Sequence, residues 1–107
     1  MHKFTIACLA LSATVCMPVL AQKKGDAVKG KEVFEQCGVC HSATTNEKKM
    51  GPSLKGVFKR ATLKNGKKVT EASVTDVIHK GGNGMPPFAG VLSAVEVTNL
   101  LAYLKSL

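Results

Sequence analysis

The clearest hydrophobic pattern in the chain lies near its C-terminus. Apolar residues there recur at the i, i+3, i+4 and i+7 positions of one helix face: Val97, Leu100, Leu101 and Leu104. Just upstream, Ser93 and Glu96 have the spacing of a capping box, in which each side chain accepts a hydrogen bond from the other residue's backbone N–H. The pattern predicts a helix that begins after Ser93 and continues through about Leu104.

A weaker pattern predicts a first helix over residues 27–38. Asp26 is a suitable N-cap, because its carboxylate can accept hydrogen bonds from the free N–H groups of the first turn. The apolar residues of this segment share one helix face: Val33, Phe34 and Cys37. Gly30 extends that face by one turn, and a glycine inside a helix permits another helix to come very close.

The middle of the chain contains shorter elements. A helix capped by Ser73 is predicted to reach about Lys80, where the Gly-Gly pair that follows ends it. Residues 42–58 lack a sustained hydrophobic period, which predicts an irregular loop that wraps around another group. The Asn-Gly pair at 65–66 fits either a small hairpin or an irregular turn, and residues 82–88 predict an extended segment stiffened by two prolines. Helices dominate and no βαβ pattern occurs, which favours an all-α fold.

The first 21 residues have the organisation of a secretory signal peptide. A short basic start and an apolar middle are followed by Val19 and Ala21, which suit positions −3 and −1 of a cleavage after Ala21. A retained membrane anchor is the competing interpretation, but Pro18 and the shortness of the apolar run argue against it. A lipoprotein anchored through Cys16 is disfavoured by the bulky residue before that cysteine. We therefore expect residues 22–107 to form one exported domain without membrane insertion.

Cleavage changes the composition with which the domain has to fold. Residues 22–107 keep 14 Lys and Arg against 7 acidic residues, since Lys3 leaves with the signal, so the net charge is +7. Two cysteines remain, and the domain has no Trp, one Tyr and three Phe. Because a small domain buries only about 60% of its unfolded surface, so thin a core predicts that a cofactor or another staple stabilises the fold.

The two remaining cysteines belong to the sequence CGVCH, in which two residues separate Cys37 from Cys40 and His41 follows at once. A structural zinc site needs four ligands, and no second C-x-x-C pair is present. A redox dithiol usually opens a helix after a strand, whereas this motif ends a predicted helix. A plain disulfide explains the cysteines but leaves the histidine without a role. Covalent haem attachment uses all three residues, with two thioether bonds to the vinyl groups and the histidine as an iron ligand.

From residue 25 to the C-terminus, the chain resembles a class I monohaem cytochrome c of the short bacterial type. Four stretches match signatures of that family in the same order: GKEVF at 30–34, CGVCH at 37–41, GPSLKGVFKR at 51–60 and LLAYLK at 100–105. The resemblance implies an all-α fold in which helices wrap around one covalently attached haem c. It also implies that the first and last helices cross near the haem, with Gly30 at the crossing and Phe34 packed against Leu100 and Tyr103.

The same resemblance implies the surroundings of the haem iron. His41 is implied as one axial ligand and Met85 as the other, unless Met85 only fills the core. The Pro52 carbonyl is implied to accept the proton of His41. Arg60 either offsets the charge of a haem propionate or is a solvated surface residue. Of the two other candidate ligands, Met50 is expected to be exposed or to serve in packing, and His79 is expected to point to solvent.

The resemblance implies a soluble, periplasmic, monomeric one-electron carrier rather than an enzyme, whose iron keeps both ligands as it cycles between Fe(III) and Fe(II). Lysines between the haem motif and Met85 either provide solubility or form a positive rim that steers redox partners with acidic surfaces. Nucleic-acid binding is not expected, because the chain has no reading motif and is exported. The alternatives are a cytochrome subunit of a larger dehydrogenase or oxidase complex, and a haem peroxidase or gas-binding protein with a labile Met85.

Overall fold

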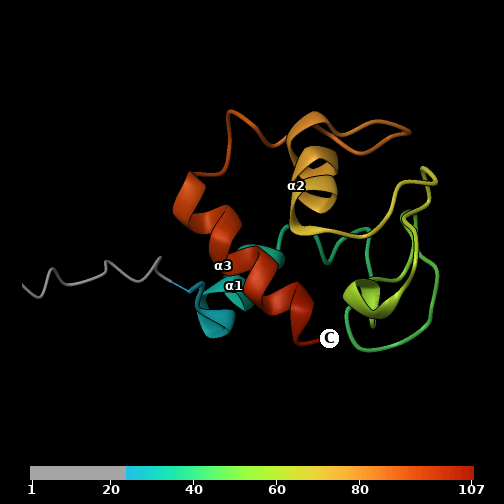
Figure 1. Cartoon of the computed structure of the whole chain (residues 1–107), viewed down its shortest axis with the longest axis horizontal. Helices are drawn as coiled ribbons and strands as arrows, with labels where there is room; N and C mark the ends of the chain where they lie inside the picture. The colour runs from blue at the N-terminus through green and yellow to red at the C-terminus, as the bar shows by residue number, and fades with distance from the viewer. Residues whose placement is uncertain (1–23) are drawn as a thin grey trace, which may run out of the picture.

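Three α-helices joined by long irregular segments make up residues 24–107, the part of the chain that the computed structural model describes (Figure 1). The helices are α1 (Ala27–Phe34), α2 (Glu71–Lys80) and α3 (Ala94–Lys105), and a 3₁₀ turn, η1 (Val57–Lys59), lies between α1 and α2. Only isolated β-bridges occur within these residues, so the predicted all-α fold is confirmed. The predicted signal peptide lies outside the described residues. None of the helices between residues 24 and 107 has the length and hydropathy of a membrane span.

α3 begins as predicted and forms the centre of the core. Ser93 Oγ accepts a hydrogen bond from Glu96 N–H (3.1 Å), and Glu96 Oε1 accepts one from Ser93 N–H (3.1 Å), which closes the capping box. The face of α3 that carries the apolar period is buried at Val97, Leu100 and Leu104. As a result, α1, η1 and α2 all pack against α3.

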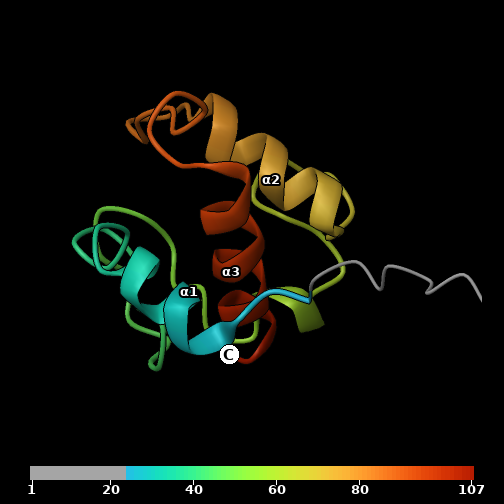
Figure 2. The ribbon, with the colours of Figure 1, turned by 90° about the vertical axis from the view of Figure 1, so that its left-hand side faces the viewer.

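α1 crosses α3 at close range, as Figure 2 shows. Asp26 caps α1, because its carboxylate accepts hydrogen bonds from the N–H groups of Val28 (2.9 Å) and Lys29 (3.3 Å). Gly30 is buried at the crossing, where a Cβ atom would lie 1.9 Å from the carbonyl oxygen of Asn99. The two helix backbones can approach this closely only because residue 30 has no side chain.

The end of α1 differs from the prediction. The helix stops at Phe34 rather than at residue 38, and residues 35–40 form successive tight turns. The Phe34 carbonyl accepts hydrogen bonds from Gly38 N–H (2.9 Å) and from Cys37 N–H (2.7 Å), and the second of these, an i, i+3 bond, tightens the chain here. Phe34 packs on Tyr103 as the resemblance implies, with their ring centroids 5.3 Å apart.

Replacing Gly30 by alanine should destabilise the folded protein, although alanine favours a helix by about 1 kcal/mol over glycine. The added Cβ would meet backbone atoms of α3, which cannot rotate away, so the helices would have to separate. Overpacking of this kind typically costs about 1–3 kcal/mol, which denaturant unfolding would measure. Gly90→Ala is the matched control, because a Cβ there meets nothing within 4 Å. Equal stabilities of the two variants would contradict the close crossing.

α2 begins three residues earlier than predicted. Thr70, rather than Ser73, is the N-cap: its Oγ1 accepts a hydrogen bond from Ser73 N–H (3.0 Å), and Ser73 Oγ accepts one from Thr70 N–H (2.9 Å). The serine hydroxyl can play the part usually taken by Glu or Gln because it accepts hydrogen bonds as well as donating them. Ser73 is therefore the third residue of α2 and not its cap.

The two Asn-Gly pairs of the chain form different turns. At 65–66 only the glycine has a positive φ (81°), and a single bridge joins the flanking residues, so the irregular alternative holds. The two-residue turn occurs instead at Asn83 and Gly84, whose φ angles are 51° and 90°. Positive φ at both central positions is the geometry that an Asn-Gly sequence favours. The segment 82–88 therefore folds back at its start, and the prediction that it is extended throughout is wrong.

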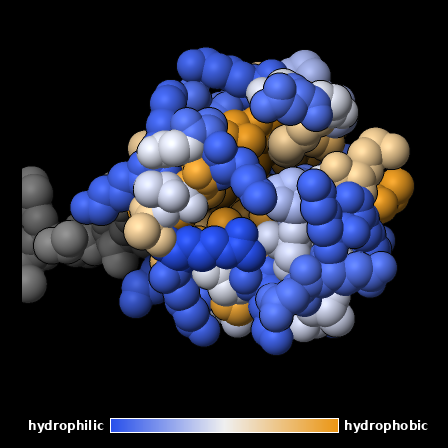
Figure 3. All heavy atoms as spheres, turned by 90° about the vertical axis from the view of Figure 1, so that its right-hand side faces the viewer, coloured by the Kyte–Doolittle hydropathy of each residue, from blue (hydrophilic) through white to orange (hydrophobic). Residues whose placement is uncertain are grey.

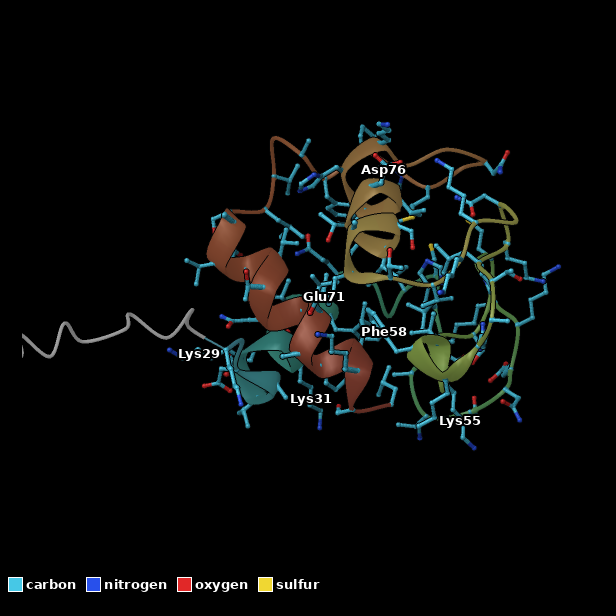
Figure 4. The ribbon with its side chains drawn as sticks, in the orientation of Figure 1. Lys29, Lys31, Lys55, Phe58, Glu71 and Asp76 are labelled. Carbon is cyan, nitrogen blue, oxygen red and sulfur yellow. The ribbon has the colours of Figure 1, made fainter. Side chains whose placement is uncertain are left out.

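Lys105, at the C-terminal end of α3, contacts both α2 and η1. Lys105 forms an ion pair with Glu71 in the first turn of α2, and its ammonium lies 5.8 Å from the centre of the Phe58 ring in η1. Figure 4 shows Glu71 and Phe58 near this end of α3. Elsewhere α2 touches α3 only slightly, which leaves space beside the apolar face of α2.

Candidate functional site

A cavity of about 510 Å³ occupies the space beside α2 and opens to the surface. Figure 3 shows apolar surface recessed between hydrophilic side chains on this face of the molecule. The volume lies within the range of about 300–1,000 Å³ that is typical of small-molecule and cofactor sites. Four of the eight buried core residues also line the cavity: Val57, Val74, Ile78 and Leu104. Core and cavity therefore share their walls.

Cys37 and Cys40 both line this cavity. Their thiols are free and not joined in a disulfide. Burial raises the pKa of the Cys37 thiol, so this sulfur is protonated and neutral at neutral pH. A nucleophilic or metal-binding cysteine has the opposite property, a lowered thiol pKa. The apolar surroundings of Cys37 suit a sulfur that becomes part of a neutral thioether bond, and they do not activate it as a thiolate.

The imidazole of His41 faces the same cavity and is oriented by one hydrogen bond. Its Nδ1 lies 2.7 Å from the carbonyl oxygen of Pro52. A carbonyl oxygen can only accept, so Nδ1 carries the proton and Nε2 keeps its lone pair. Hydrogen bonds of this kind orient metal-ligating histidines and raise their basicity. Nε2 of His41 is thus free to bind a metal ion, while the rigid Pro52 backbone holds the ring in place.

Gly51 is a part of this arrangement that the sequence analysis passed over. A Cβ at residue 51 would lie 2.4 Å from Cε1 of His41 and 3.0 Å from the carbonyl oxygen of Cys40. The Gly51 N–H also donates to that Cys40 carbonyl (2.7 Å). Only a glycine lets the chain pass this close to the ring before it presents the Pro52 carbonyl. The position of a glycine directly before Pro52 is the signal that could have identified it.

Met85 reaches the cavity from the turn that follows α2. Two reciprocal backbone hydrogen bonds between Gly82 and Met85, of 2.9 and 3.0 Å, close this turn. Beyond the two prolines, Phe88 N–H donates to the Ile78 carbonyl (3.0 Å), which anchors the segment to α2. The Met85 side chain is half-buried, and its thioether is a soft metal ligand. The structure therefore brings Met85 and His41, from distant parts of the sequence, to one cavity.

The other candidate ligands are placed less favourably. Met50 lies at the cavity rim with its side chain 85% exposed and its Sδ 4.0 Å from Cys40 Sγ, so nothing holds it in a ligating position. His79 does not line the cavity. Its predicted orientation toward solvent is only partly correct, because the residue is half-buried on α2.

Arg60 lies outside the lining of the cavity. Its Nη2 donates hydrogen bonds to the backbone carbonyls of Ser53 (2.9 Å) and Lys55 (2.8 Å). These bonds fix the loop that directly follows Pro52, whose carbonyl orients His41. In this structure Arg60 thus acts on the site through the backbone beside it.

The groups that line the cavity fit a haem and do not fit a zinc ion. Residues 24–107 contain no group of three or more His, Cys, Asp or Glu side chains that could hold a metal ion. The cavity instead combines two thiols, one imidazole with a free Nε2 and one thioether with an apolar wall. These are the groups that two thioether bonds and two axial iron ligands require.

Comparison with known sequences gives an independent result. The chain matches the family model described as cytochrome C oxidase, cbb3-type, subunit III over residues 25–104. Cytochrome c2 of Blastochloris viridis is 34% identical, over 98% of this chain and 93% of the relative. Cytochrome c6 of a Picosynechococcus species is 32% identical, over 90% of this chain and 89% of the relative.

Solved structures agree with the sequence relatives. Cytochrome c6 from the diatom Phaeodactylum tricornutum has a TM-score of 0.61 at 28% identity, covering 77% of this chain and 93% of that chain. Cytochrome cH from Methylobacterium extorquens has a TM-score of 0.60 at 26% identity, covering 78% of this chain and 100% of that chain. These matches and the thiol pair of CGVCH lead to one conclusion. The chain belongs to the cytochrome c family, as a small class I electron-transfer cytochrome whose cofactor is a covalently attached c-type haem.

Proposed function

We propose that the protein is a soluble, monomeric, periplasmic one-electron carrier whose haem iron is ligated by His41 and Met85. One observation carries the proposal: a free imidazole nitrogen and a thioether share an apolar cavity with two free thiols. When bound there, the haem supplies an iron that gains and loses a single electron. No substrate bond is made or broken, so the protein has no catalytic residue.

The surrounding residues keep the site unchanged during electron transfer. Pro52 holds the His41 ring in one tautomer and one orientation, and the closed turn at 82–85 limits the movement of Met85. The apolar wall excludes water, which disfavours the more highly charged oxidised site, and a thioether ligand acts in the same direction. Both effects raise the reduction potential.

The sequence of residues 1–21 supports the periplasmic part of the proposal. The basic start, apolar run and small-residue exit of residues 1–21 have the pattern of a cleaved signal peptide. Cleavage after Ala21 leaves Cys37 and Cys40 as the only thiols of the mature chain, so haem attachment faces no competing cysteine.

Alanine in place of Gly51 tests the geometry at His41. The added Cβ would push the ring away from the Pro52 carbonyl, and overpacking of this size typically costs about 1–3 kcal/mol of stability. We expect Gly51→Ala to change the absorption spectrum of the haem protein and to lower its thermal midpoint. Gly90→Ala is again the control. Identical spectra and midpoints for both variants would contradict the proposed role of Gly51.

The surface charge indicates the class of redox partner. Eight lysines lie between the CGVCH motif and Met85, and all of them are exposed: Lys48, Lys49, Lys55, Lys59, Lys64, Lys67, Lys68 and Lys80. A positive surface around a redox centre accelerates encounters with acidic proteins. We therefore propose partners with acidic surfaces, brief encounters, and electron-transfer rates that fall as salt screens the charges.

A second candidate function differs only in the partner. The matched family model is described as a subunit of a cbb3-type cytochrome c oxidase, which favours a fixed place in a larger complex. Co-purification separates the two functions: a free carrier elutes as a monomer from a periplasmic extract, whereas a subunit elutes with its complex.

The experiment that tests the carrier proposal is a challenge with external ligands. Because Met85 occupies the sixth iron position, carbon monoxide should bind the reduced protein, and cyanide the oxidised protein, only slowly at neutral pH. Rapid binding of either ligand without displacement of a protein group would overturn the proposal. That outcome would support the peroxidase or gas-binding alternative.

A further inference from the structure

The wall of the cavity contains one charged side chain, and it is not Arg60. Among the described residues that line the cavity, only Lys64 carries a formal charge at neutral pH. Within residues 24–107, Lys64 forms no ion pair, while the nearby Lys67 and Lys80 both pair with Asp76, at 3.9 and 2.8 Å. The hydrogen bond from Lys80 holds the pKa of Asp76 below its usual range, so this carboxylate stays ionised on the outer face of α2 (Figure 4). Lys64 is therefore the unpaired cation among the described residues that line the cavity, and it is exposed to solvent.

Asn65 lines the cavity next to Lys64 and offers a second donor. Its Oδ1 accepts a hydrogen bond from Lys67 N–H (3.0 Å). A backbone N–H can only donate, so this bond fixes which side of the amide carries the oxygen. The Nδ2 group keeps two hydrogens, and no acceptor for them occurs among the residues that the structure describes.

The backbone holds both side chains on a closed loop. Leu63 N–H donates to the Lys67 carbonyl (2.8 Å), and Gly66 N–H donates to the Leu63 carbonyl (2.9 Å). The bridge between residues 62 and 68 closes the same loop one residue further out. Lys64 and Asn65 therefore belong to a loop whose backbone is held by hydrogen bonds. Leu63, next to them, adds an apolar side chain to the cavity wall.

A haem carries two propionate groups, and a carboxylate beside an apolar wall requires charge-assisted hydrogen bonds. We propose that Lys64 and Asn65 bind one haem propionate, with the Lys64 ammonium as its counter-charge and the Asn65 amide as a further donor. This assignment rests on the proposed haem function of the cavity. Arg60 has a different part, because its Nη2 is bound to the Ser53 and Lys55 carbonyls and the residue lies outside the lining.

The assignment has two measurable consequences. A cation next to a carboxylate favours its ionised form, so Lys64 lowers the pKa of the propionate that it holds. The same positive charge disfavours the oxidised haem, which carries one more positive charge than the reduced haem, and so raises the reduction potential. The titratable groups that line the cavity besides Lys64 are His41 and the two cysteines, and both thiols and the imidazole are taken up by haem binding.

The test is the reduction potential of the haem-loaded protein measured against pH in Lys64→Gln and in the control Lys68→Gln. Lys68 is exposed, carries the same charge on the same loop and does not line the cavity. The plot of potential against pH should change slope at the pKa of the propionate, and this break marks that pKa. In Lys64→Gln the break should move to higher pH by about one unit, which is a tenfold rise in the proton affinity of the propionate. The potential at neutral pH should also fall. Lys68→Gln should leave the break in place, and Lys64→Arg should restore it.

Asn65→Ala should shift the break in the same direction by less than Lys64→Gln. Equal curves for Lys64→Gln and Lys68→Gln would overturn the assignment, and so would a break that moves in Arg60→Gln alone. Haem content, measured first on the unsubstituted protein, separates this inference from the function on which it rests. Absence of covalent haem there overturns the proposed function, whereas haem-loaded variants with unchanged breaks overturn only the assignment of Lys64 and Asn65.

Discussion

The Cys37→Ala/Cys40→Ala protein is expected to lose its cooperative thermal transition and most of its helical signal. Without thioether bonds, nothing covalent holds an occupant in the cavity of about 510 Å³, whose walls include four of the eight buried core residues. The cavity opens to the surface, so without the haem its apolar walls are exposed to water, and the protein loses the burial of apolar surface that is the dominant favourable contribution to folding. Total stabilities of domains are about 5–15 kcal/mol, so this loss is large enough to unfold the protein.

Circular dichroism during a thermal scan measures the effect. The control is Val39→Ala, which alters the residue between the two cysteines but leaves both thiols and removes a side chain that is 77% exposed. That variant should unfold like the unsubstituted protein. A double cysteine variant with native helical signal and a sharp transition would show that the fold does not depend on the haem.

Met85→Ala is expected to open the iron to external ligands while the haem stays attached. Removal of the thioether should abolish the weak red charge-transfer band of iron–methionine bonding in the oxidised protein. It should also allow fast binding of carbon monoxide to the reduced protein and lower the reduction potential, because a thioether ligand raises that potential. Loss of the half-buried side chain should in addition lower the free energy of unfolding by about 2 kcal/mol.

Met50→Ala is the matched control for this experiment. It makes the same substitution at the other methionine of the cavity rim, whose side chain is 85% exposed. The control should keep the charge-transfer band and stay slow in binding carbon monoxide. If Met50→Ala lost the band and Met85→Ala kept it, the axial ligand would be Met50 and the proposed site would be wrong.

The sequence predicts best where local signals agree with one another. For α3, the apolar period, the capping box and the helix-forming residues all point to the same segment, and the structure confirms its start at Ala94 after the Ser93 cap. Asp26 likewise predicts the start of α1 correctly, and Gly30 its close crossing with α3. These features depend on neighbouring residues or on one helix face, and both can be read along the chain.

Where the sequence predicts the boundary of an element or the place of a turn wrongly, more than one site in the chain suits the same capping or turn role. Thr70 and Ser73 are both good caps, and their mutual hydrogen bonds decide the start of α2. Two Asn-Gly pairs occur, but only Asn83 adopts the positive φ that the two-residue turn needs. At the end of α1, the i, i+3 hydrogen bond from Cys37 N–H to the Phe34 carbonyl tightens the chain, and the helix ends before both cysteines. Propensity alone does not separate these choices.

The chemistry of the site is predictable from the CGVCH motif, but its walls are not. The roles of Gly51 and Lys64 depend on how segments far apart in the sequence meet at one cavity. Sequence reasoning offered Arg60 either as the charge-compensating residue or as a solvated surface residue, and it counted Lys64 only among the lysines of a possible positive rim, because Lys64 belongs to no motif. The structure places Lys64 at the cavity and binds Arg60 Nη2 to backbone carbonyls.

The most direct test of the central claim is the intact mass and oxidised absorption spectrum of the exported protein. We expect a chain that begins at residue 22, is heavier than its polypeptide by one haem, and shows both a low-spin c-type spectrum and the iron–methionine band. A denaturing step before the mass measurement should not remove the haem, since Cys37 and Cys40 hold it covalently. A polypeptide of unmodified mass with two free or disulfide-bonded thiols would contradict the account.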